Sequence, residues 1–420
     1  MVKLSEITKK GSASLLLQFI GLAISLGLNL YMTNVVGKTE YSIYVLSFSW
    51  ITLLAHSSLL GYDVLITREM SRSSNTDGIK TALFTRAIVL AVLASFFLGC
   101  GLFGVSYVLV EQEQLRIAML LSSAGIPIFS LLLLMKAYMK GHKRNEVAIL
   151  SENIVRPGLF ILAIATSIGI FSKLTIPWII LLNIAAIFVS LLVAIVLAKV
   201  KTTKASATYP IDPKFKKAAW TFFFLSFVAM VNNLADIIML GFWEQTLPEV
   251  GTYKIDLNLT NFVAMPLITL NAVIAPYLVE FFNDRTKHDH LKQIKVLVRI
   301  IFAFGLILCI AFAVEPQFFL NLFGKDYLLG TAPLVILGFG QLFNVFVGPV
   351  GNALNMANSE RIVFKVSALT LVLNLGLNAL LIPYYGLIGA AVATVSSLVL
   401  WNIILAIQLK IKHGVNISII

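Results

Sequence analysis

A few polar side chains interrupt long apolar stretches of this chain, and their types suit the binding of an ion. Asp236 lies in the segment VNNLADIIMLG, with no basic neighbour on its own helix. Asn374 and Asn378 are four residues apart and so share one helix face, and Thr394 lies among small residues in GLIGAAVATVSS. Hard cations take oxygen ligands. These four residues therefore predict a site for a monovalent cation such as Na⁺ or for a proton, with a hydrogen-bonded buried acid as the alternative for Asp236.

A second group of ionisable residues also lies within or at the ends of apolar stretches. In lipid such a side chain costs several kcal/mol unless it is paired or faces water. Glu152 and Arg156, four residues apart, form either a structural ion pair or part of a cavity wall. The residues that we predict to bind substrate are Arg156, Arg86, Lys254, Glu152 and Asp256.

The elements that must position these residues are membrane helices. Apolar residues make up 59% of the 420 residues and charged residues 12%, against about 45–50% and about 25% in soluble domains. Stretches of about 20 apolar residues, each able to cross a bilayer as a helix, recur along the chain. Only helices and closed barrels satisfy their backbone in lipid. The pattern predicts an all-α polytopic membrane protein.

We expect twelve transmembrane helices in two six-helix lobes around a central cavity. The predicted spans are 12–34, 41–66, 81–108, 114–137, 147–170, 175–199, 218–243, 251–280, 296–316, 331–356, 362–383 and 387–409. The longest hydrophilic connection divides the chain into an N-terminal lobe (1–200), a cytoplasmic linker (201–217) and a C-terminal lobe (218–420). Since each half has an even number of spans, the halves share one orientation, as parallel repeats do.

Basic residues predict the orientation of these spans. Every run of Lys and Arg falls on one side of the predicted membrane, and the longest lies in KTTKASATYPIDPKFKK. The other side holds only Lys38, Arg116, Lys173, Lys254 and Lys325. Short loops with this bias lie in the cytoplasm. We therefore expect both termini to be cytoplasmic, and we attribute the net charge of +12 to topology, with no nucleic acid as partner.

Several classes of function are disfavoured by what the sequence lacks. It contains no HExxH, GxSxG or CxxC motif, and the predicted loops are too short for a soluble nucleotide-binding domain or for a large domain that holds a sugar acceptor. An enzyme would therefore have no nucleophile with a partner. We predict a protein that is not an enzyme.

Two segments resemble a known superfamily. The segment VVGKTEYSIYVLSFSWITLLAHSSLLGYDVLITREMSR resembles a Gly-x-x-x-(Tyr/Phe)-(Gly/Ser)-x-Tyr stretch with a basic exit, and DIIMLGFWEQTLPEVGTYKIDLNLTNFVAMPLITLNAVIAPYL resembles a seventh-to-eighth span unit. With its twelve spans, the chain resembles the multidrug/oligosaccharidyl-lipid/polysaccharide exporter (MOP) superfamily. Within it the chain is most similar to the Wzx-type oligosaccharide flippases, including those for O-antigen and other polysaccharide repeat units.

The resemblance implies roles for individual residues. The superfamily's lipid II flippase binds its cation with an acid on span seven, polar residues on span eleven and a Thr on span twelve. Asp236, Asn374, Asn378 and Thr394 occupy those positions. Asn378 is an amide where that relative has a second acid. Asn261 stands where that relative has a substrate-contacting Arg, so this contact is not implied here.

The resemblance also implies a function. We expect a flippase that moves undecaprenyl-diphosphate-linked oligosaccharide across the bacterial inner membrane by alternating access, coupled to a cation, for O-antigen or capsule biosynthesis. Arg156, Arg86 and Lys254 would then contact the diphosphate. Expected partners are this lipid-linked sugar, the membrane lipids, a polysaccharide polymerase and a chain-length regulator, with no cofactor besides the coupling ion. The alternative is a cation-coupled multidrug exporter of the same superfamily.

Overall fold

The computed structural model describes residues 4–72, 77–171, 174–200, 213–243, 245–283 and 288–419, and helices make up nearly all of them. These described ranges contain no β-strand, which confirms the predicted all-α fold. Most of the predicted linker, 201–212, lies outside them. Internal contacts divide the chain into two compact units, Met1–Met230 and Val231–Ile420. The predicted lobe boundaries stay a prediction, since this division falls inside the helix that follows the linker.

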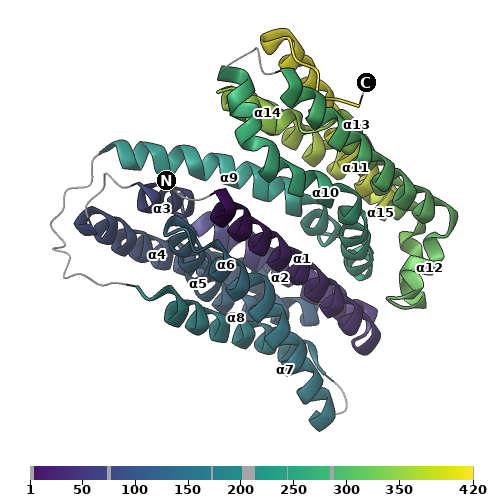
Figure 1. Cartoon of the computed structure of the whole chain (residues 1–420). Coiled ribbons are helices and arrows are strands. Elements are labelled where there is room, and N and C mark those ends of the chain that lie inside the picture. Colours follow the sequence, from purple (N-terminus) through teal and green to yellow (C-terminus); the bar gives the residue numbers. More distant parts are fainter. Residues whose placement is uncertain are drawn as a thin grey trace. The chain divides into compact units, whose positions relative to one another are not determined.

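The first unit is coloured purple to teal in Figure 1. Its elements are α1 (Leu4–Val35), α2 (Lys38–Ser58), α3 (Tyr62–Ser71), α4 (Asp77–Leu109), α5 (Glu113–Gly141), α6 (Asn145–Ile149), the π-helix η1 (Leu150–Val155), α7 (Arg156–Phe171), α8 (Ile176–Ala198) and the first part of α9 (Pro213–Leu240). Helix α5 packs against α2, α4 and α8. Helix α5 also contacts α3 and α6 and therefore forms the centre of this unit.

The predicted second span is broken. Helices α2 and α3 meet at a bend of 55°. At this bend Leu60 and Gly61 both have left-handed backbone conformations, with φ of 50° and 77°. A side chain at Gly61 would also collide with the backbone of α9 at Ala219 and Phe223. Glycine is therefore needed here both for its conformation and for a close helix approach, and the continuous helix predicted over 41–66 is wrong at this point.

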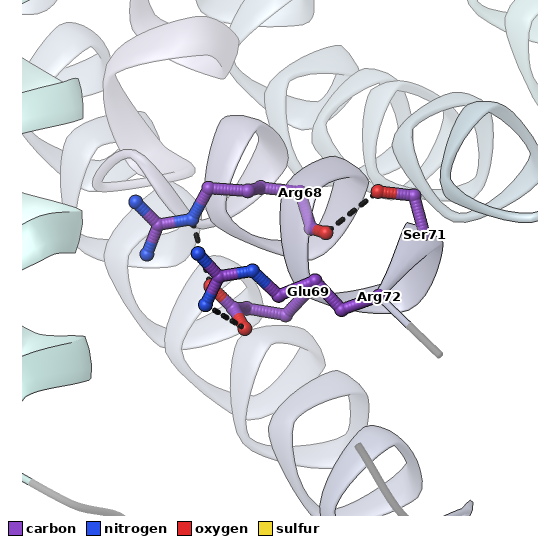
Figure 2. A network of polar contacts seen from close by, with 4 residues as sticks. All are labelled: Arg68, Glu69, Ser71 and Arg72. Atoms are coloured by element: carbon purple, nitrogen blue, oxygen red, sulfur yellow. Dashed lines mark hydrogen bonds and ion pairs between the residues drawn. The ribbon is translucent and has the colours of Figure 1, made fainter. Parts of the chain in front are cut away.

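Helix α3 ends in a compact group of charges, drawn in Figure 2. The carboxylate of Glu69, which is only 1% exposed, accepts from Arg68 Nε over 2.7 Å and from Arg72 Nη1 over 3.3 Å. The Arg68 guanidinium also lies 5.0 Å from the ring centroid of Phe222 on α9, within cation–π range. Two cations thus neutralise a buried acid, and one of them links α3 to α9.

The predicted fifth span is helical but irregular. It consists of α6, the π-helix η1 and α7 in direct succession. Pro157, the second residue of α7, has no N–H to donate and its ring clashes with the carbonyl four residues earlier. A π-helical stretch widens the backbone just before the proline and so relieves this clash. The widening changes which side chains of this span share a face.

The second unit is coloured green to yellow in Figure 1. Its elements after α9 are η2 (Leu247–Glu249), α10 (Val250–Asn283), α11 (His288–Val314), α12 (Pro316–Asn321), η3 (Lys325–Gly330), α13 (Thr331–Val347), α14 (Val350–Met356) and α15 (Glu360–His413). Helix α13 packs against α10, α11 and α15. An apolar core formed by α10, α11, α13, α14 and the end of α15 includes Leu278, Val298, Val345 and Leu405.

Helix α15 contains two spans. Its 54 residues would reach roughly 80 Å at about 1.5 Å per residue, far more than a bilayer core of about 30 Å. Gly386 interrupts it, with φ of 52° and ψ of −125°. In the described residues, ten helices are long and apolar enough to cross a membrane, or eleven with the bent pair α2–α3. Dividing α15 at Gly386 gives the twelve predicted spans.

The outer surface of these helices is apolar. Large side chains such as Phe97, Val108, Val372 and Tyr384 are between 69% and 83% exposed. Water-soluble proteins rarely expose contiguous apolar patches of this extent, whereas lipid accepts them. The chain is a multi-span membrane protein, as predicted. The inner membrane and the cytoplasmic termini remain predictions.

Candidate functional site

A carboxylate on α9 is surrounded by hydrogen-bond donors from α10 and α15. Asn378 Nδ2 donates to Asp236 Oδ1 over 2.6 Å, and the Tyr253 hydroxyl donates to Oδ2 over 3.1 Å. The Thr394 hydroxyl also donates to Oδ2. Asp236 is 6% exposed, and none of the ion pairs found in the described part of the chain includes it. Its charge is therefore balanced by three neutral donors.

A second layer of amides supports this carboxylate. Asn378 Nδ2 also donates to Asn374 Oδ1 over 3.1 Å, and Asn374 Nδ2 donates to the Ser397 hydroxyl over 3.4 Å. Asn378 is fully buried, yet its Oδ1 has no hydrogen-bond partner. Buried polar atoms are rarely left unpaired. This orphaned oxygen marks the point where the group is incomplete.

The break in α15 explains how distant residues meet. Asn374 and Asn378 lie before Gly386, and Thr394 lies after it. Past the break, Gly389 comes so close to the backbone of Leu381 that a side chain there would collide with it. The two halves of α15 therefore pack closely against each other. The four predicted cation residues come together on this scaffold, while their role as ligands stays a prediction.

The group has suitable atoms for a hard monovalent cation. It contains two carboxylate oxygens, the hydroxyl of Thr394 and the amide oxygens of Asn374 and Asn378. Rotating the Asn378 amide by half a turn would direct its unpaired oxygen toward Asp236, which is favourable only if a cation or proton lies between them. This rotation would break the hydrogen bonds that Asn378 Nδ2 donates to Asp236 and Asn374, so it needs the compensation that a bound ion or proton provides. The residues fit Na⁺.

A basic group occupies the first unit. The Arg156 guanidinium lies 4.7 Å from the ring centroid of Phe48 on α2, and the Tyr44 hydroxyl is within its hydrogen-bonding reach. Its Nε and Nη1 atoms are buried and have no hydrogen-bond partner. An arginine stacked on an aromatic face with free donors is arranged to receive an anion.

Glu152 does not form an ion pair with Arg156. It accepts an ion-pair hydrogen bond from Lys136 on α5, so the first of the two alternatives for this pair of residues, a structural ion pair, is wrong, and the second, a place in a cavity wall, stays a prediction. Because residues 150–155 form a π-helix, a spacing of four residues no longer places two side chains above one another. Both partners are partly buried, with side-chain exposures of 23% for Lys136 and 16% for Glu152.

Lys136 also reaches a cavity within the first unit. This cavity of about 290 Å³ lies beside the α2–α3 bend. It is lined by His56, Leu59, Asp63, Val64, Thr67, Leu133, Lys136, Ala137 and Lys140. Two ammonium groups face one carboxylate there, which leaves the lining with an excess of positive charge when His56 is neutral. The Arg156 guanidinium lies close enough to Lys136 for the two charges to act on each other. We call Arg156 and the cavity lining together the Arg156–Lys136 region.

The remaining predicted substrate residues are not part of the cavity lining described within the first unit. Arg86 is exposed on α4. Lys254 and Asp256 lie on α10 in the second unit, where Asp256 is fully buried. In the described chain no ion pair joins these two residues. Their predicted contact with substrate stays untested, although Asp256 is closed to any substrate in this conformation.

Comparison with known proteins identifies the family. The profile of the family described as "Polysaccharide biosynthesis protein" matches residues 7–282, well over half of the chain. The chain belongs to this family. An uncharacterised membrane protein of Methanocaldococcus jannaschii is 33% identical over 146 residues, which are 32% of this chain and 28% of that protein. The chain thus matches less than a third of the length of this relative.

Solved structures share the fold of this family member along nearly its whole length. An inward-facing multidrug resistance MATE family transporter of the MOP superfamily has a TM-score of 0.73 at 13% identity, covering 96% of this chain and 98% of that one. The lipid II flippase MurJ in an inward closed conformation scores 0.70 at 16% identity, covering 94% and 87%. Identities this low show a common fold alone. The predicted MOP-type fold is confirmed.

A third structure adds a comparison of pockets. A MOP superfamily transporter from Pyrococcus furiosus, described by the "reverse polarity" of its binding pocket and a suggested "different function", scores 0.62 at 13% identity, covering 96% and 95%. The family profile itself covers the Arg156–Lys136 region and Asp236 but ends before Asn374, Asn378 and Thr394. Three of the four predicted cation residues therefore lie beyond the matched residues.

Three residues of these sites were missed by the sequence analysis. Tyr253 reads as an ordinary aromatic residue in a span, and nothing in its spacing indicates that it donates to Asp236. Lys136 and Lys140 were attributed to the basic side of the membrane, because they lie at the end of a predicted span. Their side chains instead line a cavity. The useful signal was the register of Lys136 and Lys140, which are four residues apart on one face of α5.

Proposed function

We propose that this family member is a flippase for a lipid-linked oligosaccharide, of the Wzx type. The substrate is an undecaprenyl-diphosphate-linked repeat unit, moved across the bacterial inner membrane by alternating access for surface polysaccharide biosynthesis. The observation that carries this proposal is the Arg156 guanidinium, which is stacked on Phe48 and whose buried Nε and Nη1 atoms have no hydrogen-bond partner.

The chemistry of the Arg156–Lys136 region suits a diphosphate. A guanidinium presents several donors in a plane and binds phosphate oxygens in a bidentate manner. Lys136 and Lys140 add ammonium groups close by. A diphosphate-sugar headgroup cannot enter hydrocarbon unaided, whereas its lipid tail can remain in the bilayer. A basic, polar region inside a membrane protein provides the surroundings that the headgroup requires.

Glu152 provides a way to close this region when no substrate is bound. Its carboxylate forms an ion pair with Lys136 in this structure. A diphosphate would compete with Glu152 for Lys136, and the displaced carboxylate would then be free to move. Binding of substrate would thereby change the contact between η1 and α5.

Asp236 and its neighbours supply the energy coupling in this proposal. A Na⁺ ion, when bound, would be held by Asp236, Asn374, Asn378 and Thr394. The ion drives transport only if it binds one conformation better than the other. A separation of α9 from α15 in the other conformation would be such a difference, because the proposed ligands come from both helices.

The positive charge of the region argues against the alternative of a multidrug exporter. Cationic drugs would need acids and aromatic faces, whereas here Arg156, Lys136 and Lys140 outnumber the nearby acids Glu152 and Asp63. The Pyrococcus furiosus transporter described by its reversed pocket polarity provides a precedent within the fold for pockets of different charge.

The decisive experiment is deletion of the gene in its native host. Lipid-linked glycans are then analysed by mass spectrometry, together with the membrane face that holds them. We expect intact diphosphate-linked repeat units on the cytoplasmic face and loss of surface polysaccharide. Restoration by the wild-type gene, but not by the Arg156→Ala variant, assigns the defect to this site. Normal surface glycan with altered drug tolerance would contradict the flippase proposal and favour the exporter.

A further inference from the structure

A second carboxylate of the second unit is buried without any partner. Asp256 on α10 has an exposure of 0%. Neither Oδ1 nor Oδ2 has a hydrogen-bond partner. Leaving a charged carboxylate in such surroundings would cost far more than a single unpaired neutral group. Asp256 therefore needs a companion that the contacts of the described residues do not provide.

The threonine hydroxyl groups close to Asp256 in the sequence donate their hydrogen bonds to other acceptors than its carboxylate. Thr252 Oγ1 donates to Glu249 Oε2 over 3.1 Å, and Thr260 Oγ1 donates to the backbone oxygen of Asp256 over 2.8 Å. On the opposite side lies Gly330, the last residue of η3. A methyl group added to Gly330 would lie 2.7 Å from Oδ1, 2.8 Å from Oδ2 and 2.9 Å from Thr252 Cγ2. The carboxyl group thus fills the space that a side chain at Gly330 would take.

The charged neighbours do not compensate Asp256. Glu249 is the charged group that acts on it, and this interaction is repulsive. Lys254, two residues away on α10, forms no ion pair with it in the described part of the chain. On η3, Lys325 and Asp326 are exposed. The like charge of Glu249 makes an ionised Asp256 still less favourable.

The other titratable side chains around Asp256 are tyrosines and a cysteine, which carry no positive charge in either protonation state. Tyr253 lies on α10 and directs its hydroxyl to Asp236, and Tyr327 is the buried tyrosine of η3. Cys309 of α11 packs near Thr260, one turn along α10. Helix α13, which also packs against α10, carries no ionisable side chain. None of these groups supplies a positive charge.

We infer that Asp256 is a proton-binding site, occupied by a proton in this conformation and separate from the cation site at Asp236. A metal cation is the poorer occupant, because a cation needs several oxygen ligands. Asp236 has the hydroxyl of Thr394 and the amides of Asn374 and Asn378 around it. Asp256 has a glycine and hydroxyls that point away. A proton needs only the carboxyl oxygen itself.

The position of Gly330 indicates how the proton would be exchanged. Residue 330 joins η3 to α13, so a shift of this junction away from α10 would admit water to the carboxyl group. The proton then passes from the carboxyl oxygen to water and leaves a solvated carboxylate, and closure requires the reverse. Asp256 would therefore bind and release one proton as the second unit changes conformation, in addition to any ion at Asp236.

Infrared spectroscopy of the purified full-length protein in lipid nanodiscs tests this inference directly. A protonated carboxyl group has a C=O stretching band that an ionised carboxylate lacks. At neutral pH we expect a difference spectrum between wild type and Asp256→Asn to show the loss of one such band. Asp326→Asn, which changes an exposed acid, should leave the band intact. Identical spectra for wild type and a folded Asp256→Asn protein would overturn the inference.

Two further measurements keep the test decisive if Asp256→Asn does not fold. In wild type alone, the band should persist on titration to mildly alkaline pH, where exposed acids are ionised; its absence at neutral pH would reject the site. Gly330→Ala should shift or remove the band, because its methyl group displaces the carboxyl. Neither measurement requires a transported substrate, so failure here is distinguishable from failure of the flippase proposal.

Discussion

The Asp236 site and the Arg156–Lys136 region handle buried charge in opposite ways. Asp236 receives three hydrogen-bond donors and has no cation beside it. Arg156 keeps two buried donor nitrogens without an acceptor. At the first site the carboxylate has its donors and one amide oxygen, Asn378 Oδ1, is unpaired, whereas at the second site the unpaired atoms are donor nitrogens. In the function proposed above, the Arg156–Lys136 region would receive the anionic headgroup and the Asp236 site a small cation.

The largest effect should come from removing the charge at Asp236. In Asp236→Asn the three donors lose their charged acceptor and a cation loses its only formal negative charge. We expect the ion dependence of transport to fall by about tenfold or more, within the usual range of coupling free energies. Transport of fluorescently labelled lipid-linked oligosaccharide in proteoliposomes, with and without a Na⁺ gradient, measures this.

The control for Asp236→Asn is Asp326→Asn, which changes an exposed acid of the same unit. It should transport with the ion dependence of wild type. A well-folded Asp236→Asn protein that kept both its transport rate and its Na⁺ dependence would remove the cation site from the comparison.

Truncation of Arg156 should have the next largest effect. Arg156→Ala removes the guanidinium whose Nε and Nη1 are unpaired. A charge-assisted hydrogen bond contributes about 1.5–3 kcal/mol, so the affinity for a diphosphate should fall about 10- to 100-fold. The shift in melting temperature with added short-chain prenyl diphosphate gives this affinity. Arg156→Lys should recover only part of it, since an ammonium group lacks the planar donors.

Arg361→Ala is the matched control, because Arg361 is an exposed arginine of the other unit. Its diphosphate affinity should equal that of wild type. If Arg86→Ala lost more affinity than Arg156→Ala, the anion site would lie on α4 and the Arg156–Lys136 region would lose its proposed role.

A change at Glu152 should strengthen anion binding. Glu152→Gln releases Lys136 from its ion pair without changing the size of the side chain. The affinity for prenyl diphosphate should rise roughly two- to fivefold, the range expected for a partly exposed ion pair. Lys136→Met should lower it. The same melting-temperature assay compares the two, and a loss of affinity in Glu152→Gln would mean that Glu152 itself contacts the ligand.

The sequence predicted the Asp236 site better than the Arg156–Lys136 region, and helix geometry explains why. Asn374 and Asn378 lie on a regular α-helix, so a spacing of four residues correctly placed them on one face. Glu152 and Arg156 have the same spacing, but the π-helix at 150–155 separates them. No local sequence pattern predicts a π-helix, although Pro157 indicates that the helix is distorted close by.

The limits of prediction were similar for the fold. Composition and span length sufficed for a multi-span helical protein, because lipid leaves few alternatives. The break between α2 and α3 was missed, since it depends on the approach of Ala219 to Gly61. That contact joins segments more than 150 residues apart in the sequence. Tertiary contacts between such distant segments cannot be predicted from the local sequence around either residue.

The smallest effect should come from a substitution of Tyr253. It distinguishes residues that only donate hydrogen bonds to Asp236 from residues that would also bind the ion. Tyr253→Phe keeps the ring but removes one of the three donors to Asp236. Without Na⁺ the unfolding free energy should fall by about 0.5–1.5 kcal/mol. Bound Na⁺ should then protect this variant more than it protects wild type, because the ion-free carboxylate is less well satisfied and ligand stabilises only the form that binds it.

Thr394→Val gives the contrasting result that completes this test. The valine has a similar shape but lacks the hydroxyl that both donates to Asp236 and could ligate the ion. Its ion-free stability should fall like that of Tyr253→Phe, whereas Na⁺ should protect it less than wild type. Melting curves over a series of Na⁺ concentrations, with K⁺ at equal ionic strength as reference, separate the two variants. Equal protection of both would mean that Thr394 serves only as a donor and that the ion takes its oxygens from the two asparagines.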